Sequence, residues 1–370
     1  MSLIDEIDLR RREIRTDGYA MSIGEWISLY EKKELDIHPE FQRFFRWSDT
    51  QKTNLIESIL LGIPLPPIFV SQRTNGVWDV VDGLQRLSTI FQLLGILKDE
   101  KGKTVAPLVL QGTKYLPSLN GLKWQDEKSV KKSLPQEAQL SLKRSKLSVS
   151  IILKESDENA KYDLFQRLNT GGSELSPQEV RNCLLLMINK KMFEWLRTLA
   201  QYEPFKQVSA LSDRPIEESY DVELVLRFMV LHNLNEKGFQ SIGDVGVFLT
   251  EEMTALARNK KFDYKINEQV FKKTFDLLAS TIGENAFKRF STSKSRHEGG
   301  FLLSQFEVVA LGLASNVRNN TAVASSKISA LVAGIWSDQR YTAWSSSGIN
   351  ASRRVPKLIP LGRSIFKKSP

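Results

Sequence analysis

The stretch VWDVVDGLQRLSTIFQLL, residues 77–94, decides the expected fold of the first half of the chain. Its opening, residues 77–81, is mainly β-branched or aromatic, which is typical of a buried strand. Asp82 and Gly83 interrupt this strand, and apolar residues then recur at helical spacing from residue 84. The sequence therefore predicts a strand that turns at Gly83 and continues directly as a helix.

Such a corner has a physical reason to bind anions. The first N–H groups of a helix lack intrahelical partners, and the helix dipole leaves partial positive charge there. Gly83 lets a phosphate approach the backbone closely. Arg86 can donate two hydrogen bonds to phosphate oxygens, Gln85 can orient a water molecule, and Asp82 can hold a divalent cation. The same residues also fit an ordinary turn and helix cap, so the fragment alone leaves both interpretations open.

Three helices carry signals at their N-termini. Capping boxes are expected at Ser22 with Glu25 and at Ser48 with Gln51, because a serine and a Glu or Gln three residues later can satisfy each other's backbone N–H groups. Ser176 is expected to cap a further helix. These helices alternate with the predicted strands, as in an α+β fold.

Strand and helix patterns divide the chain unevenly. Residues 68–81 predict a hairpin and residues 147–153 a further strand, whereas only helical periodicity is visible beyond about residue 195. We therefore expect an α+β N-terminal domain followed by a mainly α-helical C-terminal domain. The expected limits are 16–195 for the first domain, with an irregular polar insertion at 99–145, then 196–338 for the helical domain and 339–370 for a basic tail.

Two further polar clusters are candidates for lining a cleft. In HPEFQRFFRW, Gln42 and Arg43 stand among bulky aromatic residues that can anchor the segment. In LFQRLNTGGSELS, Arg167 and Asn169 end a predicted helix just before a Gly-Gly corner. A half-buried strand with solvent-facing arginines explains the first cluster equally well, and a helix C-cap explains the second.

The composition argues against several classes of protein. No apolar stretch approaches the roughly 18 residues of a membrane helix. The charged start MSLIDEIDLRRREIR does not fit a signal peptide, so we expect a cytoplasmic protein without membrane contact. A single cysteine, Cys183, excludes an internal disulfide and a cysteine-rich metal site. His38, His232 and His297 lack the spacing of metal ligands or of a His-Asn-His nuclease.

The charge of the chain fits a polyanionic partner, and a solvated basic tail explains it equally well. The formal net charge is +9 and the pI is near 9.4. Residues 339–370 contain seven Lys or Arg and no Asp or Glu. DNA is the expected partner of such basic surfaces, and its binding would weaken with salt because phosphate charge dominates the affinity.

Four motifs gain specificity from their order. They are IHPEFQRFFRW, NLIESILLGIPLPPIFV, WDVVDGLQRLSTI and LFQRLNTGGSELSPQEVRN. In this order they resemble the bacterial family that supplies the N-terminal domain of GmrSD-type modification-dependent restriction enzymes and of related anti-phage proteins. The resemblance runs from about Thr16 to about Leu186. It implies a ParB/sulfiredoxin-like fold with an Asp-Gly-Gln-Gln-Arg nucleotide motif.

The resemblance also implies roles for individual residues. Asp82, Gln85 and Arg86 would act in hydrolysis of a nucleoside triphosphate (ATP, GTP or CTP), with Mg²⁺ at Asp82. The remaining nucleotide-binding positions implied by the family are Gln42, Arg43, Gly83, Arg167 and Asn169.

Two departures from the family pattern shape the functional hypotheses. Position 84 is Leu where the family usually has Gln, which would slow or abolish hydrolysis, and the chain looks like a short form without the His-Asn-His nuclease domain. The leading hypothesis is a nucleotide-binding, NTP-hydrolysing component of a bacterial defence system that engages DNA, a partner nuclease or another subunit. The alternatives are a ParB-like metal-dependent nuclease that uses Asp82, and a non-catalytic DNA-binding or adaptor module. The sequence leaves the nucleotide and the oligomeric state open.

Overall fold

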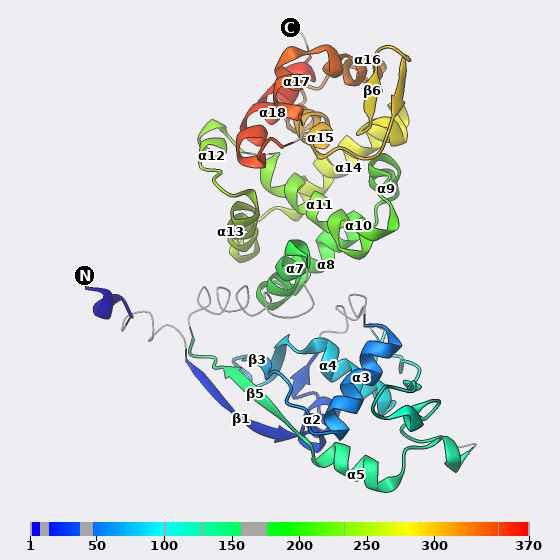
Figure 1. The fold of residues 1–370 in the computed structure, drawn as a ribbon. Coiled ribbons are helices and arrows are strands. Elements are labelled where there is room, and N and C mark those ends of the chain that lie inside the picture. The colour runs from blue at the N-terminus through cyan, green and yellow to red at the C-terminus, as the bar shows by residue number, and fades with distance from the viewer. Residues whose placement is uncertain are drawn as a thin grey trace. The chain divides into compact units, whose positions relative to one another are not determined.

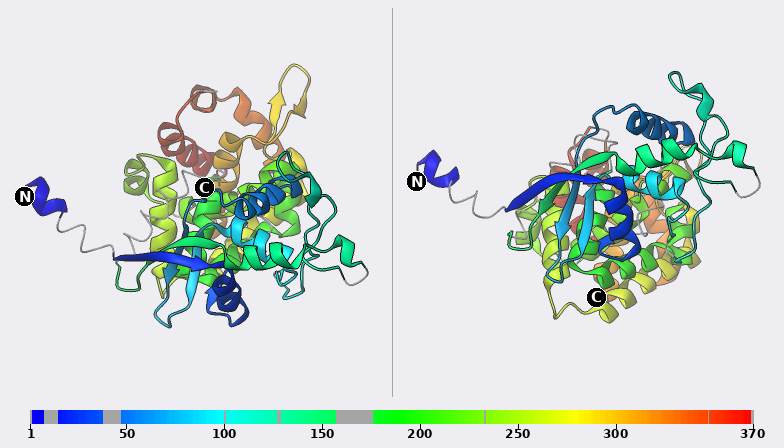
Figure 2. Two further views of the ribbon diagram at one scale, coloured as in Figure 1. Left: turned by 60° about the horizontal axis from the view of Figure 1, so that its bottom comes forward. Right: turned by 90° about the horizontal axis from the view of Figure 1, so that it is seen from below.

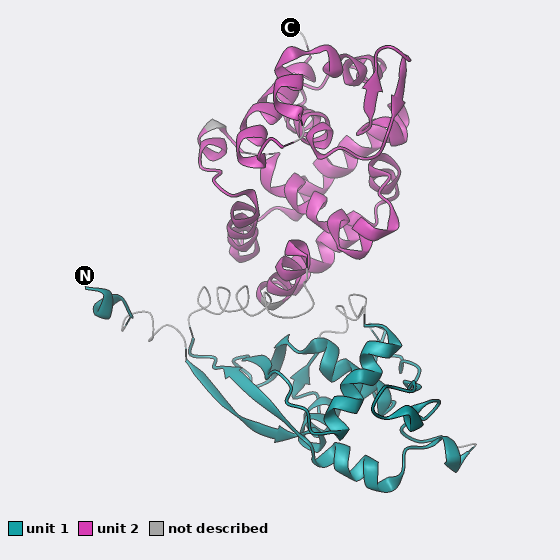
Figure 3. Cartoon of the chain, in the orientation of Figure 1, with its two compact units in different colours: residues 1–174 teal, residues 175–370 magenta. Residues whose placement is uncertain are grey.

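The computed structural model divides the chain into two compact units, residues 1–174 and residues 175–370 (Figure 3). The residues that the structure describes are 2–7, 15–37, 47–99, 101–126, 129–156, 176–232, 234–346 and 348–368.

A five-stranded mixed sheet forms the centre of the first unit, with strand order β1-β5-β3-β4-β2 (Figure 1). The antiparallel pairs are β1 with β5 and β3 with β4, whereas β3–β5 and β2–β4 are parallel. β1 is an edge strand (Figure 2). The predicted hairpin at 68–81 and the strand at 147–153 are confirmed by β3, β4 and β5. The strands are β1 (Thr16–Ser22), β2 (Leu35–Asp36), β3 (Ile68–Gln72), β4 (Trp78–Asp82) and β5 (Lys146–Ile152).

Two helices of the first unit begin where the local sequence predicts. Both capping boxes form: Ser22 with Glu25 opens α2 (Ile23–Glu31), and Ser48 with Gln51 opens α3 (Asp49–Leu60). The segment expected to be irregular contains η2 (Pro117–Leu119), η3 (Val130–Lys132) and the helix α5 (Gln136–Arg144). It also contributes buried leucines to the core, so it is an integral part of the unit; they are Leu108, Leu110, Leu119, Leu134 and Leu142.

One hydrophobic cluster joins these helices to the sheet. Trp26 of α2, Ile56 of α3 and Phe91 of α4 (Leu84–Leu93) are fully buried in it. Alternate residues of the strands complete the cluster, as the period of two in a strand requires. Those residues are Ile68, Val70, Leu147, Val149 and Ile151.

The described residues of the second unit form helices and one short hairpin, which agrees with the mainly α-helical half expected from the sequence. Its core includes a group of phenylalanines on α9, α11 and α14, with Phe205, Phe228, Phe271 and Phe275 in ring contact. The helices are α7 (Pro177–Ile188), α8 (Lys190–Ala200), α9 (Glu203–Ser209), α10 (Asp213–Glu217), α11 (Tyr220–Leu231), α12 (Glu236–Gln240), α13 (Val245–Arg258), α14 (Tyr264–Thr281), η4 (Gly283–Asn285), α15 (Leu303–Arg318), α16 (Ser325–Gly334), η5 (Ile335–Ser337), α17 (Gln339–Ser345) and α18 (Ala351–Ile365), and the hairpin strands are β6 (Arg289–Ser291) and β7 (Arg296–Glu298).

The end of the chain differs from the basic tail expected over 339–370. It forms α17 and α18, and α18 packs along α15 (Figure 1). Val355, Leu358 and Ile359 of α18 are fully buried. These apolar residues are difficult to recognise in the sequence because basic residues stand between them. The basic residues occupy the other faces of the same helix. The unit boundary also falls before α7, whereas the expected N-terminal domain ran to residue 195.

Among the residues that the structure describes, no helix combines the length and the apolar character that crossing a bilayer requires.

Candidate functional site

The corner between β4 and α4 has the geometry that the sequence predicts. β4 ends at Asp82, Gly83 adopts φ +96° and ψ 11°, and α4 begins at Leu84. This left-handed conformation favours glycine, and a Cβ at position 83 would overlap Cδ1 of Ile68. Among the described residues, no side chain caps α4. The N-terminal end of this ten-residue helix therefore keeps its partial positive charge without a capping side chain.

Arg86 makes contacts that the sequence did not suggest. Its side chain is only 10% exposed. Nη1 donates to the carbonyl oxygen of Pro66, and Nη2 donates to the carbonyl oxygen of Pro67 at 3.2 Å and to Oδ2 of Asp82 at 3.1 Å. Burial lowers the pKa of Arg86, and the carboxylate of Asp82 opposes that effect. Arg86 thus connects the Pro66–Pro67 segment, which directly precedes β3, to the corner between β4 and α4.

Within the described residues, the guanidinium keeps two N–H groups beyond those that contact its three partners. Arginine has five N–H groups, and the three contacts to Pro66, Pro67 and Asp82 use three of them. An anion at the corner could therefore bind the Arg86 guanidinium while that group keeps its contacts to Pro66, Pro67 and Asp82.

The two residues between Gly83 and Arg86 behave differently from each other. Leu84 is partly buried and packs against the hydrophobic core of the first unit. It therefore stabilises the start of α4 and offers no polar group to a water molecule or a base. Gln85 is half buried, and its backbone carbonyl accepts a hydrogen bond from Oγ1 of Thr89 at 2.7 Å.

A cavity lies on the same cross-strand row of the sheet as Asp82. Asp82 pairs with Phe69 on β3, Phe69 pairs with Ser150 on β5, and Ser150 pairs with Gly18 on β1. An irregularity in the β3–β4 register falls between Phe69 and the next residue, and such bulges are frequent beside binding sites. The cavity of about 450 Å³ is lined by Thr16, Asp17, Gly18, Phe69, Ser150 and Ile152.

The described part of the corner fits a phosphate better than an isolated metal ion. No group of three or more His, Cys, Asp or Glu able to hold a metal occurs among the described residues. The Asp82 side chain is one-third exposed and bonded to Arg86. One carboxylate suits a Mg²⁺ ion that takes its remaining ligands from phosphate oxygens and water. Gln42, Arg43, Arg167 and Asn169, the other sequence-predicted site residues, lie outside the described residues.

A second cavity was not anticipated from the sequence. It has a volume of about 790 Å³ and lies beyond the C-terminal end of α4, where Gly95 and Ile96 line it. Arg73 lines it too and bonds Oδ2 of Asp36 at 2.8 Å and Oδ2 of Asp79 at 2.8 Å, which raises the pKa of the arginine. Its walls come from segments near residues 30–37, 73–77 and 95–104, so no local motif marks it.

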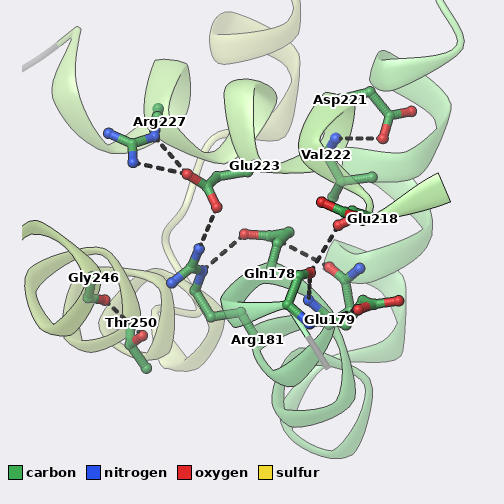
Figure 4. A network of polar contacts seen from close by, with 12 residues as sticks. Gln178, Glu179, Arg181, Glu218, Asp221, Val222, Glu223, Arg227, Gly246 and Thr250 are labelled. Atoms are coloured by element: carbon green, nitrogen blue, oxygen red, sulfur yellow. Dashed lines mark hydrogen bonds and ion pairs between the residues drawn. The ribbon is translucent and has the colours of Figure 1, made fainter. Parts of the chain in front are cut away.

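The described end of the last motif, residues 176–182, takes part in a buried polar network of the second unit (Figure 4). Arg181 of α7 donates to Oε2 of Glu223 at 2.7 Å, and Arg227 donates to Oε1 of the same carboxylate at 2.9 Å. Gln178 accepts from Nε of Arg181 at 2.8 Å. The polar residues of PQEVRN are therefore buried, and Arg181 among them ties α7 to α11.

These features define a class: an α+β domain with a strand–glycine–helix corner suited to anions, followed by a helical unit. Residues 23–186 match the family described as the GmrSD restriction endonuclease N-terminal domain. The resemblance expected from the ordered motifs is thereby confirmed. The match includes α7 and so crosses the boundary between the two units. Neither the curated proteins nor the solved structures gave a match to the chain.

Proposed function

We propose that this protein belongs to a bacterial restriction or anti-phage system and that its N-terminal domain, of ParB/sulfiredoxin-like fold, binds a nucleoside triphosphate. The phosphates would lie at the N-terminal end of α4. The observation that carries the proposal is the uncapped helix start at Gly83, next to a cavity on the same row of the sheet. The family match supports it, because that family is named for restriction endonucleases.

The residues of the corner would divide the work of binding. The backbone N–H groups at the start of α4 and the Gln85 side chain would contact phosphate oxygens. Asp82 would hold a Mg²⁺ ion together with those oxygens, and Arg86 would keep Asp82 oriented through their 3.1 Å contact. The bound triphosphate would supply the phosphoanhydride bond for hydrolysis. Leu84 packs in the core and cannot orient a water molecule, so we expect tight binding with slow turnover.

The first test is nucleotide binding by the full chain. Isothermal titration with ATP, GTP and CTP in the presence of Mg²⁺ would be combined with phosphate-release assays with and without DNA. Gln85→Ala should weaken binding roughly tenfold, the loss of about one charge-assisted hydrogen bond. Arg144→Ala, which removes an exposed cation at the end of α5, should leave binding unchanged. Absence of binding to all three nucleotides at millimolar concentration would refute the proposal.

Variants of Arg86 test whether a loss of binding comes from misfolding, and a variant of Asp82 separates the alternative functions. Arg86→Ala removes the tie to Pro66 and Pro67, so Arg86→Lys and an unfolding curve must accompany it. Metal-dependent nicking of plasmid that Asp82→Asn abolishes would instead identify a ParB-like nuclease. Salt-dependent DNA binding by a chain that binds none of the nucleotides would identify a non-catalytic adaptor, the outcome that Leu84 favours.

A further inference from the structure

The C-terminal helices enclose a groove that combines cations with an aromatic ring. It lies between α17 and α18 and has a volume of about 390 Å³. Arg340 and Trp344 come from α17, and Lys357 comes from α18. The lining is completed by Pro360, Leu361 and Ser364.

The cations of this groove have few acidic neighbours. Lys357 is exposed and lies with Nζ 5.9 Å from the centre of the Trp344 ring. Arg353 is exposed one helical turn earlier on α18, on the same face. Among the described residues, neither Lys357 nor Arg353 forms an ion pair. The segment from residue 339 onward contains no Asp or Glu, and of the two cations that line the groove Arg340 pairs with Asp338.

Arg340 is held in place for a ligand. Its Nε donates to Oδ1 of Asp338 at 3.1 Å and its Nη2 donates to Oδ2 at 2.7 Å. This bidentate contact fixes the plane of the guanidinium and leaves Nη1 available. Asp338 itself caps the start of α17, so the carboxylate that orients Arg340 is placed by the fold.

The two helices that form the groove are firmly attached to the unit. Arg354 donates to Glu307 of α15 through Nε at 2.7 Å and Nη2 at 2.9 Å, and the Glu307 side chain is fully buried. Gly362 of α18 meets Gly312 of α15 backbone to backbone. The backbone positions of α18 that carry Arg353 and Lys357 are therefore held in place, which lowers the entropy lost when a ligand binds.

We propose that this groove is a nucleic-acid site that binds the phosphodiester backbone of DNA. Arg340, Lys357 and Arg353 would contact phosphates, and a base would stack on Trp344. An aromatic ring flanked by fixed cations matches a strand that alternates phosphates with flat bases, whereas an acidic peptide supplies charge without the rings. The site belongs to the second unit and does not depend on nucleotide binding at the α4 corner.

The test measures the affinity of the full chain for fluorescently labelled DNA of about 20 nucleotides by fluorescence anisotropy. Single-stranded and duplex DNA are each titrated over a series of salt concentrations. Lys357→Gln combined with Arg353→Gln should weaken binding at least tenfold at low salt and reduce the slope of log K against log salt by roughly 1.5–2. Lys265→Gln, which removes an exposed cation on α14, is the matched control and should bind like the wild type. Trp344→Leu should weaken single-strand binding about tenfold if a base stacks there.

The outcomes distinguish the proposals. Unchanged affinity of the Lys357–Arg353 double variant for both DNAs overturns the groove as a DNA site. Displacement of DNA by polyglutamate at equal charge also overturns it and assigns the groove to an acidic protein. A loss in Trp344→Leu identifies the single strand as the ligand, and a loss only in the double variant identifies duplex backbone. Gln85→Ala should bind DNA normally, so failure of the nucleotide proposal leaves this result unaffected.

Discussion

Substituting Gly362 by alanine should destabilise the second unit by about 3 kcal/mol, even though the change adds a single methyl group. A Cβ on Gly362 would lie 2.8 Å from the carbonyl carbon of Val308 and 3.1 Å from Cα of Gly312, and would overlap the Val308 carbonyl oxygen. All three are main-chain atoms, so no side chain can rotate away. The helices α15 and α18 must separate instead.

The magnitude follows from what that separation affects. Inserting a methyl group into a tight contact costs about 1–3 kcal/mol. A gap of about 1 Å also forfeits up to half of the dispersion energy of the contacts across it, which include those of buried Val355, Leu358 and Ile359. The better helix propensity of alanine returns about 1 kcal/mol. With overpacking at about 3 kcal/mol, a dispersion loss of about 1 kcal/mol and a propensity gain of about 1 kcal/mol, the net loss is about 3 kcal/mol.

Urea unfolding, followed by tryptophan fluorescence and circular dichroism, would measure the loss. Gly334→Ala, at the end of α16, is the control because a Cβ there meets no described atom within 4 Å, and it should be neutral or stabilising by up to about 1 kcal/mol. If the free energy of unfolding of Gly362→Ala lies within about 0.5 kcal/mol of the wild-type value, then α15 and α18 are not in backbone contact and the predicted clash is refuted. If Gly362→Ala folds but binds DNA more weakly, the groove between α17 and α18 depends on the packing of α18 against α15.

Two further predictions concern the corner and a buried histidine. Gly83→Ala should lower the free energy of unfolding by more than Gly76→Ala, because both glycines have positive φ but only a Cβ at position 83 would overlap Ile68; strain alone costs about 1–3 kcal/mol. Equal losses in urea unfolding of the two variants would contradict the clash at the corner. Burial, with a smaller contribution from the charge of Arg318, lowers the pKa of His232 from its ordinary 6.5 to about 4. The unfolded chain therefore binds this proton more tightly, so His232 contributes stability that is present above pH 6.5 and is lost as the pH falls towards 4. Between pH 7 and pH 5 the wild type should lose about 2 kcal/mol more than His232→Gln, and parallel curves of unfolding free energy against pH would exclude this cause.

Local patterns were the part of the fold that the sequence predicted well. The capping boxes at Ser22 and Ser48 involve residues three positions apart, and the turn at Gly83 depends on one backbone conformation. Such features are visible in a short window because their partners are neighbours in the chain. The family resemblance was also accessible, since it depends on the order of four such windows.

Contacts between distant residues could not be predicted in the same way. The partners of Arg86 lie on Pro66 and Pro67, and Arg73 bonds Asp36, so each contact depends on how strands pair. The docking of α18 depends on a glycine of α15 fifty positions earlier. Basic residues on the exposed face of α18 made the segment resemble a tail, although its apolar residues at helical spacing were present in the sequence.

The contacts of Arg86 have a consequence for any anion that binds at the corner. The N–H groups that hold the Pro66 and Pro67 carbonyls cannot also donate to a phosphate, so recruiting them would leave two carbonyl oxygens without these donors. Anion binding and closure of the crossing before β3 would then be linked by competition for one guanidinium. By reciprocity, whatever loosens that crossing would raise the affinity of the corner for the anion by the same factor.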